Sequence, residues 1–451
     1  MTPDELLMLA SRLAEKAAPG EQIEVACSHG ESTSIRVYEG AVESLTQAEN
    51  SGIGVRVIRD GREGFASAGT LDPDVVDQML AQARDNARFA EVDPDAGIAE
   101  PDGVEAVDID LWRDELADYS IEDKVAMAVE IEARVLAADS RIVGVRTSTY
   151  GDGAGSFALA SSNGIRAASR STSAGIGIQA LADDGNQMQT GYAGDGAREP
   201  GGLDLDEVVD RAVRQALDLL GSRKPTTRTV SLVLDPRLAA TMMSVIAGTL
   251  NGGRVIKGRT PFAGRVGETI ASPLLTFSDE PIDPDSLGAD AYDGEGLACR
   301  SVPLVTDGVL RGFVWDSYTG RRGGSGSTGS AQRAARGLPS PGVHALSVAA
   351  GEGGGLDDLI AGVEDGVLVF SLAGLHSGVN AVSGDLSLGV EGRMIRNGQL
   401  AEPIGEATVG STLQRLLLDV EAVGSDRIHL SSGISTPSLV IGDVMLSGAA
   451  A

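Results

Sequence analysis

Lysine, aromatic residues and cysteine are scarce in this sequence, and each scarcity narrows the classes of protein that fit it. Only four of the 36 basic residues are lysine, and 65 residues are acidic, which leaves a net charge of −29. Because a chain this acidic repels phosphate backbones, binding to nucleic acid is not expected. Aromatic residues make up only 3 % of the chain, so we expect a core of aliphatic side chains.

The cysteines and the apolar runs exclude two further classes. Cys27 and Cys299 lie far apart without CxxC spacing, so neither a disulfide framework nor a cysteine-based zinc site is expected. No stretch approaches about 18 uninterrupted apolar residues, so no membrane span is expected. Residues 1–16 are acidic and amphipathic, unlike a signal peptide. These features predict a cytoplasmic protein.

The sequence is rich in glycine and in short apolar patterns, which together predict an α+β fold. Its 451 residues are enough for two or three domains. We expect an N-terminal mixed α/β domain at residues 1–222 and a mostly β C-terminal domain at 229–451, joined by a linker at 221–228. The acidic stretch 91–118, broken by proline and glycine, is expected to be a surface excursion.

Apolar periodicity and turn residues place the individual elements. Helices are predicted at about 6–17, 72–89, 120–138, 205–220, 236–250 and 409–423. Strands are predicted at about 22–27, 33–37, 54–58, 64–68, 142–149, 155–161, 165–180, 187–193, 231–234, 302–306, 309–315, 366–372, 386–395, 428–430 and 438–446. The dipeptides Asp307-Gly308 and Asn397-Gly398 predict hairpin turns.

One stretch, Ser231–Glu268, combines a strand, a helix and a basic loop. Asp235 and Pro236 are suited to the start of the helix, whose apolar residues recur at helical spacing. Asn251-Gly252-Gly253 is expected to end it. The loop that follows reaches Arg265 and Glu268 with the pattern KGxxxFxGRxGE.

A second stretch, Gly374–Pro403, has glycines spaced so that a backbone can turn sharply or approach another backbone closely. It contains His376, Asn380 and Asp385. The chain also contains GSGSTG at residues 324–329, which matches GxGxxG. No strand with an acid at its end follows, so a mobile loop is expected there rather than a dinucleotide site.

The four histidines have no metal-binding spacing. They are His29, His344, His376 and His429. A Ser–His–Asp arrangement stays open, because such triads are assembled in space, although no GxSxG motif is present.

The two stretches resemble the TldD/PmbA family, once labelled modulators of DNA gyrase. The loop motif of residues 257–268 and the segment of residues 374–403 carry the resemblance, which spans essentially the whole chain. Catalytic members of the family carry a zinc-peptidase HExxxH motif on the helix before the loop. Aligning on the loop places Met243, Ser244 and Gly248 at the family's His, Glu and His positions.

None of these three residues can do the work of the motif. The two histidines grip the zinc, and the glutamate activates water. Methionine is a poor zinc ligand, serine is no general base near neutral pH, and glycine has no side chain. The family also supplies a cysteine ligand before a closing Pro-x-Leu strand, but here Pro437-Ser438-Leu439 has no cysteine nearby. The resemblance is therefore to the non-zinc branch, PmbA or TldE.

That resemblance implies a subunit without its own catalytic residues or metal. Zinc is expected in the partner, a TldD-type paralogue that forms a heterodimer or larger complex with this chain. The pair would act as a metalloprotease on unfolded or extended peptides, held by strand addition. Arg265, Glu268, His376, Asn380 and Asp385 are the candidate contacts to the peptide or cavity.

Two alternatives belong to other functional classes. The first is a stand-alone peptide-binding or scaffold protein that forms a homodimer and has no protease activity. The second is an independent hydrolase that uses His376 with Asp385 or a nearby serine.

Overall fold

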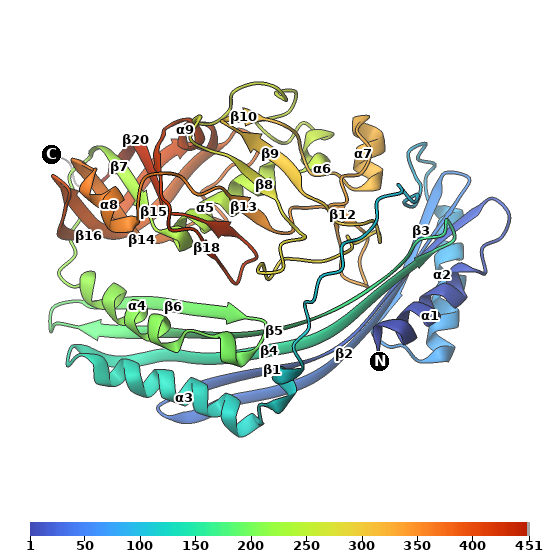
Figure 1. Ribbon diagram of the computed structural model, residues 1–451, viewed down its shortest axis with the longest axis horizontal. Coiled ribbons are helices and arrows are strands. Elements are labelled where there is room, and N and C mark those ends of the chain that lie inside the picture. The colour runs from blue at the N-terminus through green and yellow to red at the C-terminus, as the bar shows by residue number, and fades with distance from the viewer. Residues whose placement is uncertain (449–451) are drawn as a thin grey trace.

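The computed structural model describes residues 1–448 of the chain as two halves that face each other (Figure 1). The N-terminal half is built on one antiparallel sheet with the strand order β3-β2-β1-β4-β5-β6. Its strands are β1 (Glu21–Tyr38), β2 (Ala41–Arg59), β3 (Arg62–Ala68), β4 (Ile142–Ser161), β5 (Arg166–Asp183) and β6 (Met188–Ala197). The long strands β1, β4 and β5 carry the sheet under the whole C-terminal half.

Four helices lie at the two ends of this sheet. They are α1 (Pro3–Ala14), α2 (Pro73–Phe89), α3 (Ile121–Ala138) and α4 (Leu205–Asp218). Asp72 caps α2, and Ser120 with Asp123 forms a capping box at α3. These four predicted helices are confirmed, with ends within about three residues of the expected ones. The short 3₁₀ turns η1 (Asp114–Asp118) and η2 (Pro200–Gly202) complete this half.

Alternation along β1 explains why the helices and the C-terminal half cover opposite faces of the sheet. Successive side chains of a strand point to opposite faces. Ile23, Val25 and Cys27 pack in the cluster under α1 and α2, and Ile35 packs in the cluster under α3 and α4. Ala26, between them in sequence, packs instead against residues of the C-terminal half.

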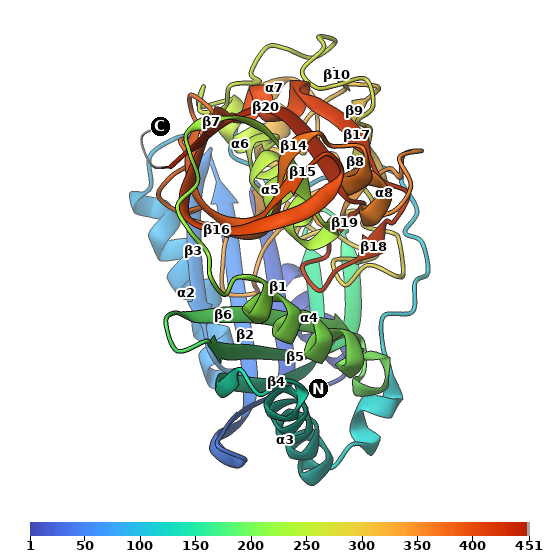
Figure 2. The same cartoon turned by 90° about the vertical axis from the view of Figure 1, so that its left-hand side faces the viewer.

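The C-terminal half is built on two six-stranded sheets and a small two-stranded one. The first has the order β16-β15-β14-β7-β20-β17, and an extra β16–β20 pairing closes five of its strands into a ring, seen end-on in Figure 2. Its strands are β7 (Arg228–Leu234), β14 (Asp365–Ala373), β15 (Asp385–Arg396), β16 (Gln399–Thr412), β17 (Val420–Val423) and β20 (Leu439–Ser447).

The second sheet has the order β10-β9-β8-β13-β19-β18. Its strands are β8 (Phe277–Asp279), β9 (Val302–Thr306), β10 (Val309–Leu310), β13 (Leu346–Val348), β18 (Ile428–His429) and β19 (Ser435–Thr436), and β11 (Ala331–Gln332) pairs separately with β12 (Ser340–Pro341). The helices here are α5 (Pro236–Thr249), α6 (Gly252–Val255), α7 (Ser317–Gly323), α8 (Leu356–Ala361) and α9 (Leu413–Leu418). Helix α5 and both large sheets contribute to one aliphatic core.

Several predicted elements are wrong in extent. The two strands predicted at 22–27 and 33–37 are one strand, β1, because β2 and β4 pair with it continuously through the glycine-containing middle. The strands predicted at 142–149 and 155–161 are likewise the single strand β4. The strand predicted at 309–315 shrinks to the two residues of β10.

The helix predicted at 409–423 is also wrong. Strand β16 continues to Thr412, only α9 is helical, and β17 follows it. Val409 pairs with both Leu388 and Leu446, so tertiary strand pairing overrides an apolar run that also fits a helix.

The acidic segment 91–118 joins the two halves rather than being only a solvated loop. Apart from η1 it has no helix, as expected for an excursion. However, Asp93 accepts a hydrogen bond from the Tyr318 hydroxyl at 2.8 Å, and Gly97 O accepts one from Arg321 at 2.7 Å. Asp102 pairs with Arg300 at 2.6 Å. The segment is therefore a strap across the two halves, visible in Figure 1.

Candidate functional site

Helix α5 carries the positions of the missing zinc motif, and its start is fixed from both halves of the molecule. Asp235 follows β7 and caps the helix, with its Oδ1 accepting the Leu238 N–H at 2.9 Å. The same carboxylate pairs with Arg211 on α4. The carboxylate is favourable there both as an N-cap acceptor and as a negative charge at the positive end of the helix dipole. Its ion pair with Arg211 fixes the start of α5 relative to the N-terminal half.

The three motif positions on α5 differ in exposure. Met243 is 1 % exposed and belongs to the aliphatic core. Ser244 and Gly248, one turn apart, are exposed. Ser244 lines the cavity between the two halves, and both residues line a second cavity formed by the C-terminal half. The Ser244 hydroxyl donates to Thr241 O at 2.7 Å, and a Cβ added at Gly248 would have no atom within 4 Å.

The donor set on α5 does not fit zinc. Its two exposed positions offer one hydroxyl and no imidazole or carboxylate, and its third position lies in the core. Across residues 1–448, no group of three His, Cys, Asp or Glu side chains is arranged to hold a metal ion. The side chains at these positions of α5 therefore cannot hold a zinc ion.

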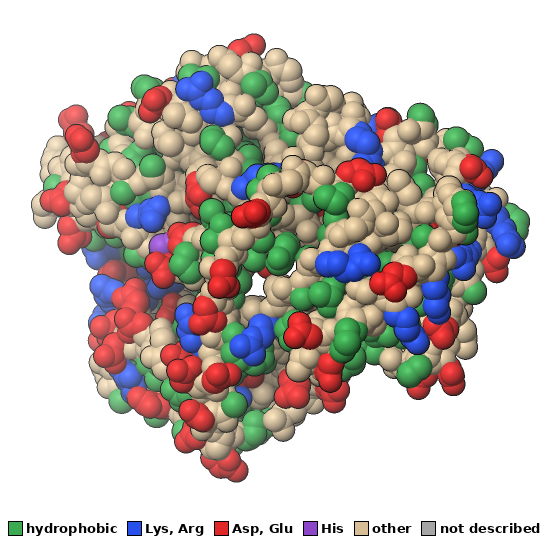
Figure 3. Space-filling model, turned by 45° about the vertical axis from the view of Figure 1, so that its right-hand side comes forward, with side chains coloured by type: hydrophobic (Ala, Val, Ile, Leu, Met, Phe, Trp, Pro, Cys, Tyr) green, Lys and Arg blue, Asp and Glu red, His purple; other side chains and the backbone are tan. Residues whose placement is uncertain are grey.

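The exposed face of α5 borders a groove between the two halves, which we call the interdomain groove (Figure 3). It consists of three adjoining cavities. The central cavity, about 590 Å³, lies between β5, β6, α4, α5 and β14. The α5–α6 cavity, about 430 Å³, shares Ser244, Ser432 and Ile434 with it, and a third of about 370 Å³ shares Glu391.

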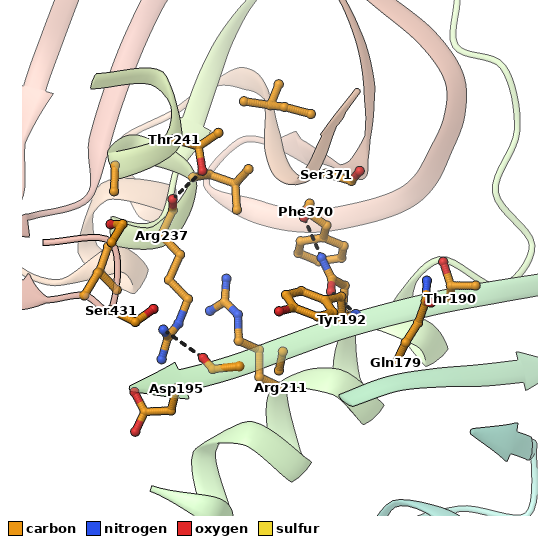
Figure 4. A pocket seen from close by; sticks show the side chains of 18 of the residues that line it. Gln179, Thr190, Tyr192, Asp195, Arg211, Arg237, Thr241, Phe370, Ser371 and Ser431 are labelled. Atoms are coloured by element: carbon orange, nitrogen blue, oxygen red, sulfur yellow. Dashed lines mark hydrogen bonds between the residues drawn. The ribbon is translucent and has the colours of Figure 1, made fainter. Parts of the chain in front are cut away.

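Polar groups line the central cavity from both halves (Figure 4). Arg237 on α5 donates to Gly194 O of β6 at 3.3 Å. Gln215 on α4 accepts the Tyr192 N–H at 2.8 Å and donates to Phe370 O of β14. These bonds connect α4, α5, β6 and β14 around one space, so both halves contribute to its shape.

Strand β6 is the edge of the N-terminal sheet at this groove. An edge strand presents backbone N–H and C=O groups that can pair with an added strand. The side chains of Gln215 and Arg237 already occupy two such groups, on Tyr192 and Gly194. The groove thus combines an edge strand, polar side chains and enough volume for an extended chain.

Five residues were predicted from the sequence to contact the peptide or the cavity. They lie in two groups outside these cavities. Arg265 and Glu268 pair with each other at 2.8 Å in the loop after α6. Asn380 and Asp385 stabilise a turn before β15, where Asn380 N donates to Asp385 O and Asp385 accepts from Ser383 at 2.7 Å. His376 is exposed in the same segment. Their role in peptide binding stays a prediction.

The groove residues Tyr192, Arg211, Gln215, Arg237 and Arg254 were missed by sequence reasoning. They come from the four elements β6, α4, α5 and α6, and none belongs to a recognisable motif. The only sequence signal for the groove was the motif position on α5 that Ser244 and Gly248 occupy.

Buried charges also hold the two halves together. Arg333, 0 % exposed, pairs with Glu24 of β1 at 2.5 Å. Burial raises the pKa of Asp293 to about 6, and burial together with the charges of Asp293, Glu24 and Asp316 raises the pKa of Glu295 to about 8.

The fold and the site define a class of α+β proteins. In this class the β-rich half presents one helix toward a long antiparallel sheet. Family models match the chain over three regions. They describe PmbA/TldA metallopeptidase domain 1 (residues 23–87), central domain (114–220) and C-terminal domain (227–448). The chain belongs to the PmbA/TldD metallopeptidase family, as its motifs predicted.

Individual relatives match over nearly the full length. Metalloprotease PmbA of Escherichia coli O157:H7 is 27 % identical, with 99 % of this chain and 96 % of that protein covered. A Metalloprotease PmbA homolog of Haemophilus influenzae is 25 % identical, with 98 % and 96 % covered. These names describe those proteins.

Solved structures have the same fold. A candidate modulator of DNA gyrase from Thermotoga maritima superposes with a TM-score of 0.89 at 23 % identity, covering 99 % of this chain and 100 % of that one. TldE from Thermococcus kodakarensis gives 0.87 at 22 % identity, covering 99 % of each chain. The predicted PmbA/TldD-like α+β fold is confirmed. Within residues 1–448, no helix is long and apolar enough to cross a membrane.

Proposed function

We propose that this chain is the non-catalytic, TldE-like subunit of a two-component metalloprotease that degrades or processes unfolded peptides. A zinc-bearing TldD-type paralogue supplies the metal and the catalytic base. This chain supplies walls of the cavity and part of the channel in which the peptide lies. Alone, it has no protease activity.

The observation that carries the proposal is the state of the exposed face of α5. Ser244 and Gly248 stand in an open groove at the positions of a catalytic motif, while Met243 is packed into the core. The groove is open, and its motif positions hold residue types that are not zinc ligands. That combination fits a subunit that contacts a peptide without cleaving it.

The residues of the groove suit an extended, sequence-independent substrate. Backbone pairing at β6 would bind any peptide main chain, because its hydrogen bonds do not depend on side chains. Arg237 and Gln215 hold the edge of β6 close to α5 and β14. A folded protein would not enter this space, whereas an unfolded segment would.

The test measures zinc and peptidase activity of the purified chain, with and without the paralogue that carries HExxxH. We expect less than stoichiometric zinc on the chain alone, and cleavage of unfolded peptides only with the paralogue. A paralogue variant with its motif glutamate replaced by glutamine serves as the control for partner chemistry. Stoichiometric zinc on this chain, or robust cleavage by it alone, would overturn the proposal.

A size measurement distinguishes this function from a stand-alone homodimeric scaffold. The proposal expects a complex with the paralogue when the two are mixed at several concentrations, and a homodimer at most when this chain is alone. Peptide binding without any association between the two proteins would favour the scaffold.

A further inference from the structure

The α5–α6 cavity, at one end of the interdomain groove, has an unusual charge. Arg254 and His344 are the basic side chains that line it, and no aspartate or glutamate does. The chain as a whole has a net charge of −29. A cavity lined by a guanidinium and by no carboxylate, in so acidic a protein, is suited to an anionic group.

Arg254 is available for binding. It lies in α6, half-buried, and within residues 1–448 no carboxylate lies within 4 Å of its guanidinium and no acceptor takes a hydrogen bond from it. Its backbone N–H, by contrast, is capped by the Asn251 side chain at 3.3 Å. The backbone is therefore fixed while the charged group of the side chain remains unsatisfied. A planar guanidinium with free donors is suited to a carboxylate.

His344 is held by a buried acid behind it. Asp279, 0 % exposed, accepts the backbone N–H groups of His344 and Ala345 at 2.9 and 2.8 Å. The second oxygen of Asp279 lies 3.9 Å from His344 Nδ1. Burial opposes a charge on the imidazole, but Asp279, together with Asp290 and Asp293, outweighs it and raises the pKa of His344.

The shape of the cavity indicates where an anion would come from. Gly248 opens the wall on the α5 side, since a Cβ there would touch nothing within 4 Å. On the other side the cavity continues past Ser244 and Ser432 into the central cavity and the β6 edge. An extended chain lying along β6 would thus end at Arg254 and His344.

We propose that the α5–α6 cavity binds the terminal carboxylate of a peptide lying in the interdomain groove. Arg254 and His344 bind the carboxylate oxygens, and the groove beyond Ser244 holds the residues that precede it. The inference rests on the proposed peptide-handling function and specifies which peptides are held best. Peptides with a free C-terminus bind in one register, whereas chains without a carboxylate there bind more weakly.

The experiment measures binding of a short unstructured peptide, labelled at its N-terminus, to the purified full-length chain. The same peptide with an amidated C-terminus is the comparison. Because a hydrogen bond to a charged group contributes about 1.5–3 kcal/mol, amidation is expected to weaken binding about tenfold or more. Arg254→Ala is expected to abolish this preference for the free carboxylate.

Two further variants separate charge from shape. Arg259→Ala removes the same charge from an exposed position five residues away and is expected to keep the preference. Gly248→Leu fills the cavity without changing charge and is expected to weaken the free-carboxylate peptide selectively. Thermal unfolding of each variant checks that it is folded, and replacing glycine inside a helix favours folding.

Equal affinity for the free and amidated peptides would overturn the inference, as would an equal loss with Arg259→Ala. Competition by inorganic phosphate or acetate as strong as that of the peptide would also overturn it, because the cavity would then bind small anions. Cleavage of the amidated peptide by the pair with the paralogue distinguishes the outcomes. If cleavage persists, only the carboxylate site fails; if no peptide is bound or cleaved, the proposed function fails as well.

Discussion

Met243 and Gly248 both occupy histidine positions of the zinc motif, but their surroundings differ. Methionine fills core volume that a histidine would have to share with aliphatic neighbours. At Gly248 an added Cβ would meet no atom within 4 Å. A histidine substitution is therefore expected to affect stability very differently at these two positions.

We predict that Met243→His lowers the free energy of unfolding by about 2–4 kcal/mol, because it buries a polar ring without a partner. Gly248→His is the matched control and is expected to change stability by less than about 1 kcal/mol, since its side chain faces the groove. Urea unfolding measures both. Equal costs at the two positions would show that the face of α5 has been misassigned.

Glu295 is predicted to make stability depend on pH. Its folded pKa of about 8 lies above that of an unfolded glutamate, so the folded state holds an extra proton. The contribution of Glu295 to the free energy of unfolding is largest in acid and is lost as the pH rises through 8. From about pH 5 to 8 the free energy of unfolding should fall by up to about 1.4 kcal/mol per pH unit from this group.

Replacing the acid tests this assignment. Glu295→Gln is expected to flatten the decline of stability with pH, as measured by urea unfolding at several pH values. Glu105→Gln, at an exposed position, serves as the control and should leave the slope unchanged. A slope that is the same in Glu295→Gln as in the natural chain would contradict the assignment.

At the scale of elements, the Arg211–Asp235 pair joins α4 to the start of α5. Asp235 has two roles there, because it caps the helix and pairs with Arg211. Helix α4 also lies directly on β6, where a Cβ at Gly191 would come within 2.0 Å of Ala212 O. The positions of α4, α5 and β6 around the groove therefore depend on each other.

Substitutions at Asp235 separate its role as a helix cap from its role as the partner of Arg211. We predict that Asp235→Ala lowers the free energy of unfolding by about 2 kcal/mol, because both the cap and the partner of Arg211 are lost. Asp235→Asn keeps a capping oxygen and is expected to cost about half as much. Denaturant midpoints give the comparison. An alanine variant no less stable than the asparagine variant would mean that the cap contributes nothing.

At the scale of the whole molecule, the two halves are joined around the groove by the strap of residues 91–118, by buried charges and by the α4–α5 contacts. Arg333 and Glu24 form the most deeply buried of the ion pairs described above, at 0 % and 1 % side-chain exposure. Removing Arg333 leaves buried Glu24 with only the longer contact to Arg56, at 3.9 Å.

Arg333→Leu is predicted to lower the free energy of unfolding by up to about 3 kcal/mol, because buried Glu24 then keeps only Arg56, whose Nη1 lies 3.9 Å from it. The strap should then be cut faster in limited proteolysis, which reports on separation of the halves. Arg36→Leu removes the exposed pair with Glu43 and is expected to cost less than about 1 kcal/mol. Comparable losses in the two variants would contradict a role for Arg333 at the interface.

Much of the fold followed from local patterns in the sequence. Ser120 with Asp123, Asp72 and Asp235 specify helix starts through backbone caps, and Asn397-Gly398 specifies a hairpin through its turn geometry. Such signals need only neighbouring residues. The helix predicted at 409–423 failed because its apolar residues serve strand β16, and pairing partners distant in sequence decide that.

The sequence by itself determined the family of this protein and the absence of zinc ligands at Met243, Ser244 and Gly248, because residue identity at a motif is a one-dimensional property. Only the tertiary structure decided that Met243 belongs to the core while Gly248 opens into a groove. It also brought Arg254 and His344, from separate segments, to one cavity. The physical reason is that burial and charge in a cavity depend on distances across the fold, and spacing along the chain does not contain them.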